Sequence, residues 1–394
     1  MDTNVIEQIV KWRMGSAYDT PILDWRDDRL NFDNAGLLDR DLVGAIKVDQ
    51  AGLILSTPPG RSSYNPHIRR RIVATSEDFF NAWKGQQKSL HVVVAMQDAR
   101  LFPCVEYIGP PTDAKCVQFS YARTVDPKWR RQTELILWPL DYLFRSWKLP
   151  MFTPAPWDTR RGKILWRGQT SGLSYVLGEE AHPILMGIRS IRRWLKDFLT
   201  IEAVESEEVF HALYASYQRL VAVGICRNMA DADVRFIPMY DGDRSAIDIA
   251  EKYLGHGLFA ERISEANFLA KQQEYKYVLS LPGSDVPSSL RTDLLSGCVT
   301  LMPRPFWENV WFFGLKPYVH YIPLRADLAD IEERLQWCRD NDGHCKEIAE
   351  EARAFALKYF EPSLEFKIQS RMVERVANQM CIGTETSLSQ RVPQ

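Results

Sequence analysis

The feature that most constrains the fold is a regular alternation of strand-like and helix-like segments between residues 264 and 361. The strand-like runs are apolar, and the segments between them carry apolar residues at helical spacing. The expected strands are 275–281, 298–302 and 319–324, and the expected helices are 265–274, 288–295 and 328–338. Strands joined by helices predict a doubly wound α/β domain, in which ligands bind beyond the carboxyl ends of the strands.

A further strand and helix precede this region. Residues 76–86 are expected to form an amphipathic helix, and 90–96 form an almost uniformly apolar run, which is typical of a strand buried on both faces of a parallel sheet. Prolines between 150 and 156 predict a domain boundary, followed by a strand at 163–166 and a long helical region at about 183–224. Two domains are expected for 394 residues, because one core is rarely so large.

Charge and hydropathy exclude several classes of protein. The 49 basic and 51 acidic side chains give a formal charge of -2, so no nucleic-acid partner is expected, since such binders carry a basic domain or stripe. The sequence contains no run of about 18 apolar residues, so no membrane-spanning helix is expected. The first residues lack the pattern of a signal peptide, and the seven cysteines form no CxxC. We therefore expect a cytoplasmic protein with reduced thiols.

The loop and helix between Leu281 and Leu295 form a candidate phosphate site. Gly283 follows a buried strand, Ser288 and Ser289 open the expected helix, and Arg291 lies in its first turn. Backbone N–H groups at a helix start attract anions, and arginine makes forked bonds to phosphate oxygens. An ordinary capped helix start has the same sequence, so the segment alone leaves both interpretations open.

A second candidate is the turn after the strand at 163–166. It carries Arg167, Gly168, Thr170 and Ser171. Glycine lets the backbone approach a ligand, and the other three side chains can donate to an anion, although the same residues also make ordinary turns.

Carboxylates offer two kinds of chemistry. Asp98 follows the apolar run at 90–96, where it could serve as a general base or, more simply, cap a helix or pair with Arg100. Two Asp-x-Asp pairs, Asp231 with Asp233 and Asp241 with Asp243, could hold a divalent cation on a diphosphate. Such pairs also arise by chance, and the second resembles a turn.

Other polar features are assigned to structure. His320 lies within an apolar run and is expected to be a hydrogen-bonded core histidine. The basic clusters Arg69–Arg71 and Arg189–Lys196 are solvated faces in the simplest interpretation. Contact between these clusters and an anionic membrane surface, such as the inner membrane face, stays open.

Taken in order, these segments resemble glycosyltransferase family 90, which includes protein O-glucosyltransferases, capsule xylosyltransferases and bacterial lipopolysaccharide glycosyltransferases. The resemblance covers about residues 75–360 and is strongest in the last third. Its motifs are Tyr275-Lys276-Tyr277, Ser288-Ser289-Leu290-Arg291, Leu295-Ser296-Gly297-Cys298-Val299, Leu315 to Leu324 with Asp327-Leu328, Trp166-Arg167-Gly168 with Thr170-Ser171, and Val94 to Asp98 with Pro103.

The resemblance implies a GT-B fold, with two Rossmann-like domains facing across a cleft and no cofactor or obligatory metal. It implies an acceptor-side domain with the catalytic base Asp98 over 1–157 and a nucleotide-sugar-binding domain over 158–361. A C-terminal helix and tail over 362–394 would pack back toward the first domain. The implied donor-binding residues are Arg167, Gly168, Thr170, Ser171, Gly283, Ser288, Ser289 and Arg291.

The function that the resemblance implies is inverting transfer of a hexose or pentose, glucose or xylose being favoured. The donor would be a UDP-sugar, and the acceptor a hydroxyl of a glycan or glycolipid such as lipopolysaccharide or capsule. The sequence departs from the family where Gln169-Thr170 replaces a second basic residue. An inactive glycan- or nucleotide-binding relative, and a metal-dependent transferase built on Asp241 and Asp243, are the alternatives. The oligomeric state stays open.

Overall fold

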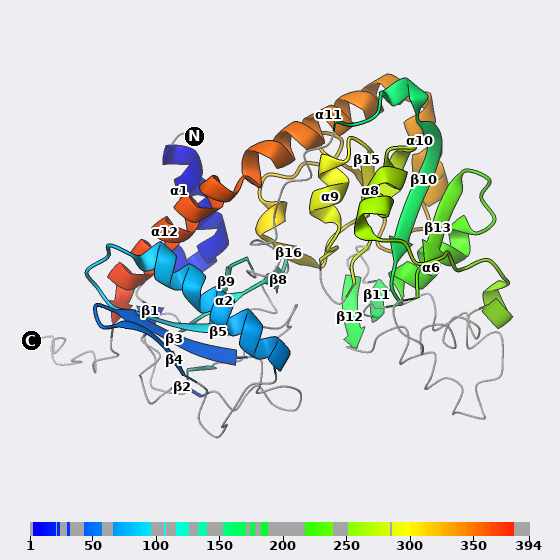
Figure 1. Cartoon of the computed structure of the whole chain (residues 1–394). Helices are drawn as coiled ribbons and strands as arrows, with labels where there is room; N and C mark the ends of the chain where they lie inside the picture. The colour runs from blue at the N-terminus through cyan, green and yellow to red at the C-terminus, as the bar shows by residue number, and fades with distance from the viewer. Residues whose placement is uncertain are drawn as a thin grey trace, which may run out of the picture. The chain divides into compact units, whose positions relative to one another are not determined.

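The chain divides into two compact units, which we describe separately. Unit 1 comprises Met1–Lys148, Trp307–Phe313 and Phe360–Gln394, and unit 2 comprises Leu149–Phe306 and Gly314–Tyr359. The structure is a computed structural model (Figure 1). It describes residues 3–20, 22–23, 30–31, 43–56, 66–95, 106–107, 116–125, 133–139, 153–170, 174–177, 183–187, 217–238, 251–283 and 286–381.

A five-stranded mixed sheet forms the centre of unit 1. Its strands are β3 (Val43–Asp49), β4 (Gly52–Ser56), β5 (Leu90–Ala95), β7 (Cys116–Ser120) and β9 (Thr133–Leu137), in the order β4-β3-β5-β7-β9. All six residues of β5 are buried, as predicted for the apolar run. The sheet is not wholly parallel, because β3 pairs antiparallel with both β4 and β5, whereas β7 pairs parallel with β5 and β9.

Helices cover this sheet. They are α1 (Thr3–Met14), α2 (Pro66–Trp83) and α12 (Pro362–Gln379), with the 3-10 turn η1 (Gly15–Tyr18) after α1. From α2, which extends the predicted helix toward the N-terminus, Phe79 stacks on Trp138 with ring centroids 4.0 Å apart. Helix α12 contacts α1 and α2 (Figure 1), and Arg13 forms two 2.6 Å hydrogen bonds with Glu365, with both side chains almost fully buried.

Short strand pairs complete unit 1. The parallel pair is β1 (Ile22–Leu23) with β18 (Met380–Cys381), and the antiparallel pairs are β2 (Leu30–Asn31) with β6 (Glu106–Tyr107) and β8 (Ala122–Thr124) with β16 (Trp307–Asn309), which precedes the 3-10 turn η6 (Val310–Phe312). The last strand pair carries an ion pair of 2.7 Å between Arg123 and Glu308. The segment that contains Trp307 therefore belongs to unit 1, although the chain on both sides of it belongs to unit 2.

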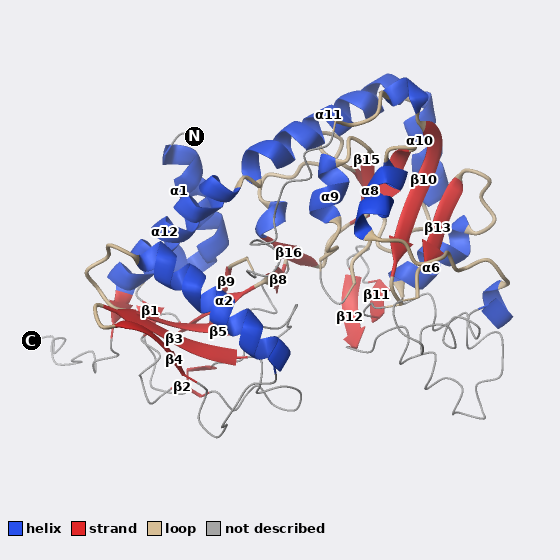
Figure 2. Cartoon of the chain, viewed as in Figure 1, coloured by secondary structure: helices blue, strands red, loops and turns tan. Residues whose placement is uncertain are grey.

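The sheet of unit 2 is parallel throughout. Its strands are β10 (Arg161–Gly168), β13 (Ala232–Phe236), β14 (Tyr275–Leu279), β15 (Val299–Pro303) and β17 (Ile322–Leu324), in the order β13-β10-β14-β15-β17. Figure 2 shows β13 beside β10. Each neighbouring pair runs parallel. All five carboxyl ends therefore meet at one edge, as the strand and helix alternation predicted.

Both faces of this sheet are covered. The helices are α6 (Gln218–Cys226), α8 (Glu265–Gln272), α9 (Leu290–Leu295), α10 (Ile331–Asp340) and α11 (Asp342–Tyr359), and the 3-10 turn η4 (Trp157–Thr159) precedes β10. Because side chains alternate along a strand, Ile164 and Trp166 join a core with α6, α10 and α11, whereas Leu165 packs on the other side with Phe268 of α8.

Two segments differ from the sequence expectation. Residues 183–187 are the strand β12 (Pro183–Gly187), which pairs antiparallel with β11 (Ser174–Leu177), so the predicted helix over about 183–224 is wrong there. Pro183 lacks the N–H of a helix interior, and the apolar residues after it pair with β11 instead. Among the described residues of that region, 183–187 and 217–224, the helix is α6, which begins at Gln218.

The expected strand at 319–324 begins at Ile322, because residues 316–321 form a turn in which Tyr318 has a φ of 57°. His320 closes this turn by accepting a hydrogen bond from the Lys316 backbone N–H to its Nδ1 at 3.0 Å, and its ring packs on Phe355. Burial lowers the pKa of His320. The prediction of a hydrogen-bonded core histidine is confirmed.

The α/β class is also confirmed, since each unit has a five-stranded sheet with helices packed on it. The arrangement of two domains across a cleft, and the acceptor and donor roles given to 1–157, 158–361 and 362–394, stay predictions. In the part of the chain that the structure describes, none of the helices is both long and apolar enough to span a membrane.

Candidate functional site

The two predicted donor segments lie at the same edge of the unit 2 sheet. Gly168 is the last residue of β10 and leads into the turn that contains Thr170, and the loop that contains Gly283 follows β14. These strands are neighbours, with Ile164 opposite Tyr277 and Leu165 opposite Val278. Their carboxyl ends face the same way, which is where ligands bind on such sheets. The fold thus brings together two segments that are far apart in the sequence.

The identity of Gly168 is explained by the ring of Trp166. A Cβ added at Gly168 would lie 2.2 Å from Cζ2 of that ring, far inside the contact limit. The ring is held in place because Trp166 is buried and meets Phe236 edge-on, with centroids 5.6 Å apart. Thr170, two residues further along, is also buried. The turn is therefore compact, with its glycine required by packing.

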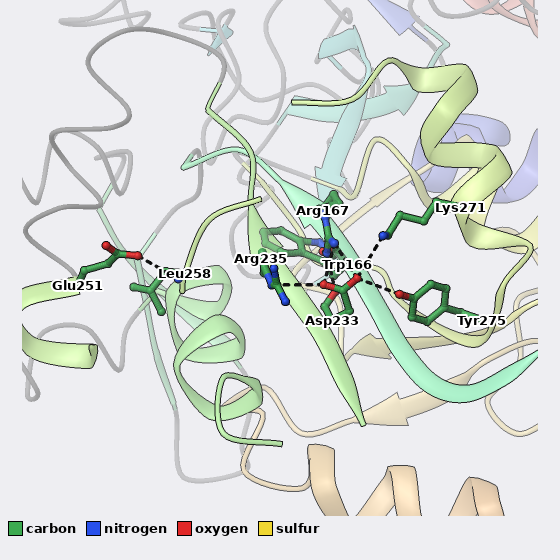
Figure 3. A network of polar contacts seen from close by, with 8 residues as sticks. All are labelled: Trp166, Arg167, Asp233, Arg235, Glu251, Leu258, Lys271 and Tyr275. Atoms are coloured by element: carbon green, nitrogen blue, oxygen red, sulfur yellow. Dashed lines mark hydrogen bonds and ion pairs between the residues drawn. The ribbon is translucent and has the colours of Figure 1, made fainter. Parts of the chain in front are cut away.

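Arg167 is engaged in a network that Figure 3 shows in full. Its Nη2 donates to both carboxylate oxygens of Asp233 at 2.7 Å, and its Nη1 donates to the Asp233 backbone oxygen at 2.6 Å. Tyr275 donates its hydroxyl to the same carboxylate at 2.9 Å, and Lys271 and Arg235 lie at 3.5 and 3.4 Å. Burial would raise the pKa of Asp233, but the bonds from Arg167 and Tyr275 outweigh it and lower that pKa.

This network bears on two predictions. The Arg167 side chain is only 5% exposed, so its main contact is with Asp233, and contact with a donor phosphate stays a prediction. Asp233 is surrounded by cations, and Asp231 pairs with Arg339 at 2.6 Å. A divalent cation is therefore disfavoured at this pair. Within the described residues there is no group of three or more side chains suited to hold a metal; Asp241 and Asp243 lie outside them.

The predicted phosphate-binding helix starts later than expected. Helix α9 begins at Leu290, and the residues before it form a turn. The Ser289 hydroxyl does not cap the helix backbone but donates to the Asp293 carboxylate at 2.8 Å. Ser288 is exposed, and Arg291 is half-buried in the first helical turn. These side chains follow Gly283 closely in the sequence, and their joint role in a donor site stays a prediction.

Asp293 was not singled out in the sequence. It is buried, and it accepts a hydrogen bond from Nε2 of Gln272 at 3.0 Å as well as the one from Ser289. Burial outweighs these hydrogen bonds and raises its pKa to about 7. The residue thereby joins α8 to the start of α9. The spacing of four residues between Ser289 and Asp293 was the only sequence hint.

Arg219 is a second residue that the sequence did not reveal. It is the second residue of α6, and it donates from Nη1 to the Gln169 oxygen and from Nη2 to the Leu281 oxygen, both at 3.2 Å. Its guanidinium also lies 5.8 Å from the centre of the Trp166 ring. The signal that could have found it is an arginine in the first turn of the apolar helix at 218–226.

Two predicted residues cannot be placed in this site. Asp98 and Ser171 lie outside the described residues. Strand β5 ends at Ala95, three residues before Asp98, and belongs to unit 1. The role of Asp98 as a base stays a prediction.

Comparison with known proteins finds similarity over the region that contains the loop after β14 and helix α9. The model of the family described as Glycosyl transferase family 90 matches residues 251–369. Uncharacterized protein 179R of Invertebrate iridescent virus 6 is 36% identical over 128 residues, which cover 29% of this chain and 11% of the viral protein. The O-glucosyltransferase LpsA of Dichelobacter nodosus is 33% identical over 96 residues, which cover 24% of this chain and 30% of LpsA.

Among solved structures, TarM matches with a TM-score of 0.36 and 10% identity, covering 66% of this chain and 50% of TarM. This likeness is too weak to support an argument. The family match confirms the predicted resemblance over 251–369, the segment that holds α8, β14, α9, β15 and β17. The matches span less than a third of the length of either curated relative.

Proposed function

We propose, with the family 90 match of residues 251–369 as the premise, that this protein is an inverting glycosyltransferase. The proposed reaction moves glucose or xylose from a UDP-sugar to a hydroxyl of a glycan or glycolipid such as lipopolysaccharide or capsule. One observation carries the proposal. The matched segment supplies the loop and helix start at the carboxyl edge of a parallel sheet, with Gly283, Ser288, Ser289 and Arg291 in sequence.

The proposed donor site is built from the segments after β10 and β14. Arg291 would bind the diphosphate through its fork of N–H groups, and the exposed Ser288 would add a hydroxyl donor. Ser289 would take part by turning its hydroxyl from Asp293 to the phosphate. Gly283 would let the backbone approach the phosphates. The turn with Gly168, Thr170 and Ser171 would line the other side. Arg167 would act mainly by holding that turn to Asp233, since most of its hydrogen bonding goes there.

The proposed mechanism is a single displacement. Asp98 would take the proton of the acceptor hydroxyl, whose oxygen bonds to the anomeric carbon while the bond from that carbon to the phosphate oxygen breaks. UDP leaves, and the configuration at that carbon inverts. Arg291 would stabilise the charge that develops on the diphosphate. No metal is required in this scheme, because the arginine side chain supplies the positive charge.

We also propose that the protein acts in a reducing compartment, the cytoplasm. The thiols support this proposal. Cys116, Cys226, Cys298, Cys338 and Cys345 are free and buried, and burial raises the pKa of Cys298 to about 11 and that of Cys226 to about 12. Such thiols are unreactive and suit a cytosolic protein.

A donor-hydrolysis screen tests the proposed function. Native protein is incubated with UDP-, GDP- and CMP-sugars, with and without EDTA, and free nucleotide is measured. We expect release from one UDP-sugar that EDTA does not change. Asp98→Asn should abolish turnover and leave UDP binding intact, whereas Arg291→Ala should weaken UDP binding. Arg161→Ala is the control, because this exposed arginine lies at the opposite end of β10. Release that requires a metal would contradict the mechanism.

A nucleotide-binding relative without transferase activity is the second candidate. It is favoured by the extent of the family match, which includes the proposed donor residues Gly283, Ser288, Ser289 and Arg291 but not Asp98. A UDP-induced rise in melting temperature, with no turnover of any sugar nucleotide in the presence of a glycan acceptor panel, would support this candidate over the transferase. No binding of any nucleotide would contradict both.

A further inference from the structure

We infer that Arg219 is a positioning residue that fixes the separation of the two proposed donor segments. It would control donor binding by holding the turn after β10 and the loop after β14 in register with each other. The inference rests on the proposed function, because these segments are the ones assigned to the donor. It adds a residue that neither the sequence motifs nor the family match includes, since the match begins at residue 251.

The backbone that carries Arg219 is firmly held. Leu220, Val221 and Val223 of α6 are buried in the unit 2 core. Gln218, the neighbouring residue, donates its Nε2 to the Ala326 backbone oxygen at 2.8 Å in a buried hydrogen bond. The first turn of α6 is thus fixed both to the sheet and to the segment after β17. A side chain that projects from this turn has a rigid base.

The guanidinium of Arg219 bridges the two segments directly. Its Nη1 donates to the backbone oxygen of Gln169, after β10, and its Nη2 to that of Leu281, after β14, each at 3.2 Å. The planar fork of arginine places two donors at a fixed separation, which the single ammonium of lysine does not do. The two backbone oxygens are therefore set apart by the width of one guanidinium group.

Two further contacts determine where the guanidinium lies. The Trp166 ring is 5.8 Å from it, and the position of a Cβ on Gly283 would be 2.9 Å from Nη2. The guanidinium thus occupies space that a side chain at position 283 would need. Gly283 is explained at least in part by Arg219, as Gly168 is explained by Trp166. Both glycines of the proposed donor site thereby pack against one connected group of side chains.

The effect on binding follows from this geometry. Arg291 and the serines can engage a diphosphate only if the loop after β14 stands at the correct distance from the turn after β10. A tenfold change in a dissociation constant corresponds to about 1.4 kcal/mol, which is the order of one hydrogen bond. Loss of the bridge is therefore expected to raise the dissociation constant for UDP about tenfold or more, with a corresponding rise in KM for the donor and a smaller change in kcat.

The test compares three variants of the full chain. Arg219→Met keeps the aliphatic part of the side chain and removes its donors, and Arg219→Lys keeps the charge and removes the fork. Arg227→Met is the matched control, because Arg227 is the exposed C-cap of the same helix. For each protein, UDP binding is measured by calorimetry, donor KM and kcat are measured separately, and folding is checked by urea denaturation.

We expect Arg219→Met and Arg219→Lys to bind UDP more weakly and Arg227→Met to match the native protein. Guanidinium chloride at a low, non-denaturing concentration should restore UDP binding to Arg219→Met, whereas sodium chloride should not. A purely structural role would reduce the folded fraction and leave the affinity of the folded molecules unchanged, which would overturn the inference. Failure of the native protein to bind UDP would instead overturn the proposed function, and this inference with it.

Discussion

Gly168 shows how a single residue in a family-like motif can be required for packing. Adding a methyl group at this position would press it into the Trp166 ring, at 2.2 Å. We expect Gly168→Ala to lower the free energy of unfolding by about 1 to 3 kcal/mol, as overpacking of a core does. Gly162→Ala, on the same strand with open space around it, should change it by less than about 0.5 kcal/mol. Urea midpoints measure both. Equal midpoints would contradict the packing explanation.

Asp293 predicts a pH dependence of stability. Its pKa is about 7 in the folded protein, against 3.8 as the ordinary value. The folded state therefore holds a proton between these values that the unfolded state has lost, and the stability from this group falls as the pH rises from 3.8 to 7. Asp293→Asn removes the titration. The urea midpoint of Asp293→Asn minus that of the native protein should increase as the pH is raised from 5 to 8. A difference that does not change with pH would contradict the raised pKa of Asp293.

The residues of the candidate site could be found in part from sequence. Gly283, Ser288 and Arg291 could be found because they follow a recognisable buried strand. The partners of Arg167 and Ser289 could not, since Asp233 and Asp293 reach them through the register of neighbouring strands and the turn of a helix. Arg219 could not be found from the sequence either, because its hydrogen-bond partners are backbone oxygens of loops that are distant in the sequence.

Among the elements, the strands were predictable wherever complete burial makes them mostly apolar, as in β5 and β15. Their bounds differ from the expectation by a few residues, because some residues expected at the strand ends form turns instead, such as the turn closed by His320. The strand β12 was missed. Apolar residues behind a proline suit a helix start as well as a strand, and only pairing with β11 decides between them.

The network around Asp233 leads to a prediction for the sheet of unit 2. Asp233→Ala would leave the nearly buried Arg167 without its carboxylate, so we expect a loss of about 3 kcal/mol in the free energy of unfolding. Asp231→Ala removes only a partly exposed pair with Arg339 and should cost less than about 1 kcal/mol. Urea denaturation with Mg²⁺ and with EDTA measures both. If Asp233 held a metal instead, EDTA would destabilise the native protein and not the variant.

At the scale of the whole molecule, the division into two units predicts which regions respond together. The chain leaves unit 2 for Trp307–Phe313 and again at Phe360, crossings that no local pattern in the sequence could reveal. Glu365→Ala would leave the buried Arg13 without its carboxylate partner. Hydrogen exchange should therefore accelerate in α1 and α12 of unit 1 and stay unchanged in the sheet of unit 2. UDP should act on unit 2 instead, slowing exchange around residues 281–291 and in the turn after β10. If UDP slowed exchange only in unit 1, the proposal that unit 2 holds the donor site would be contradicted.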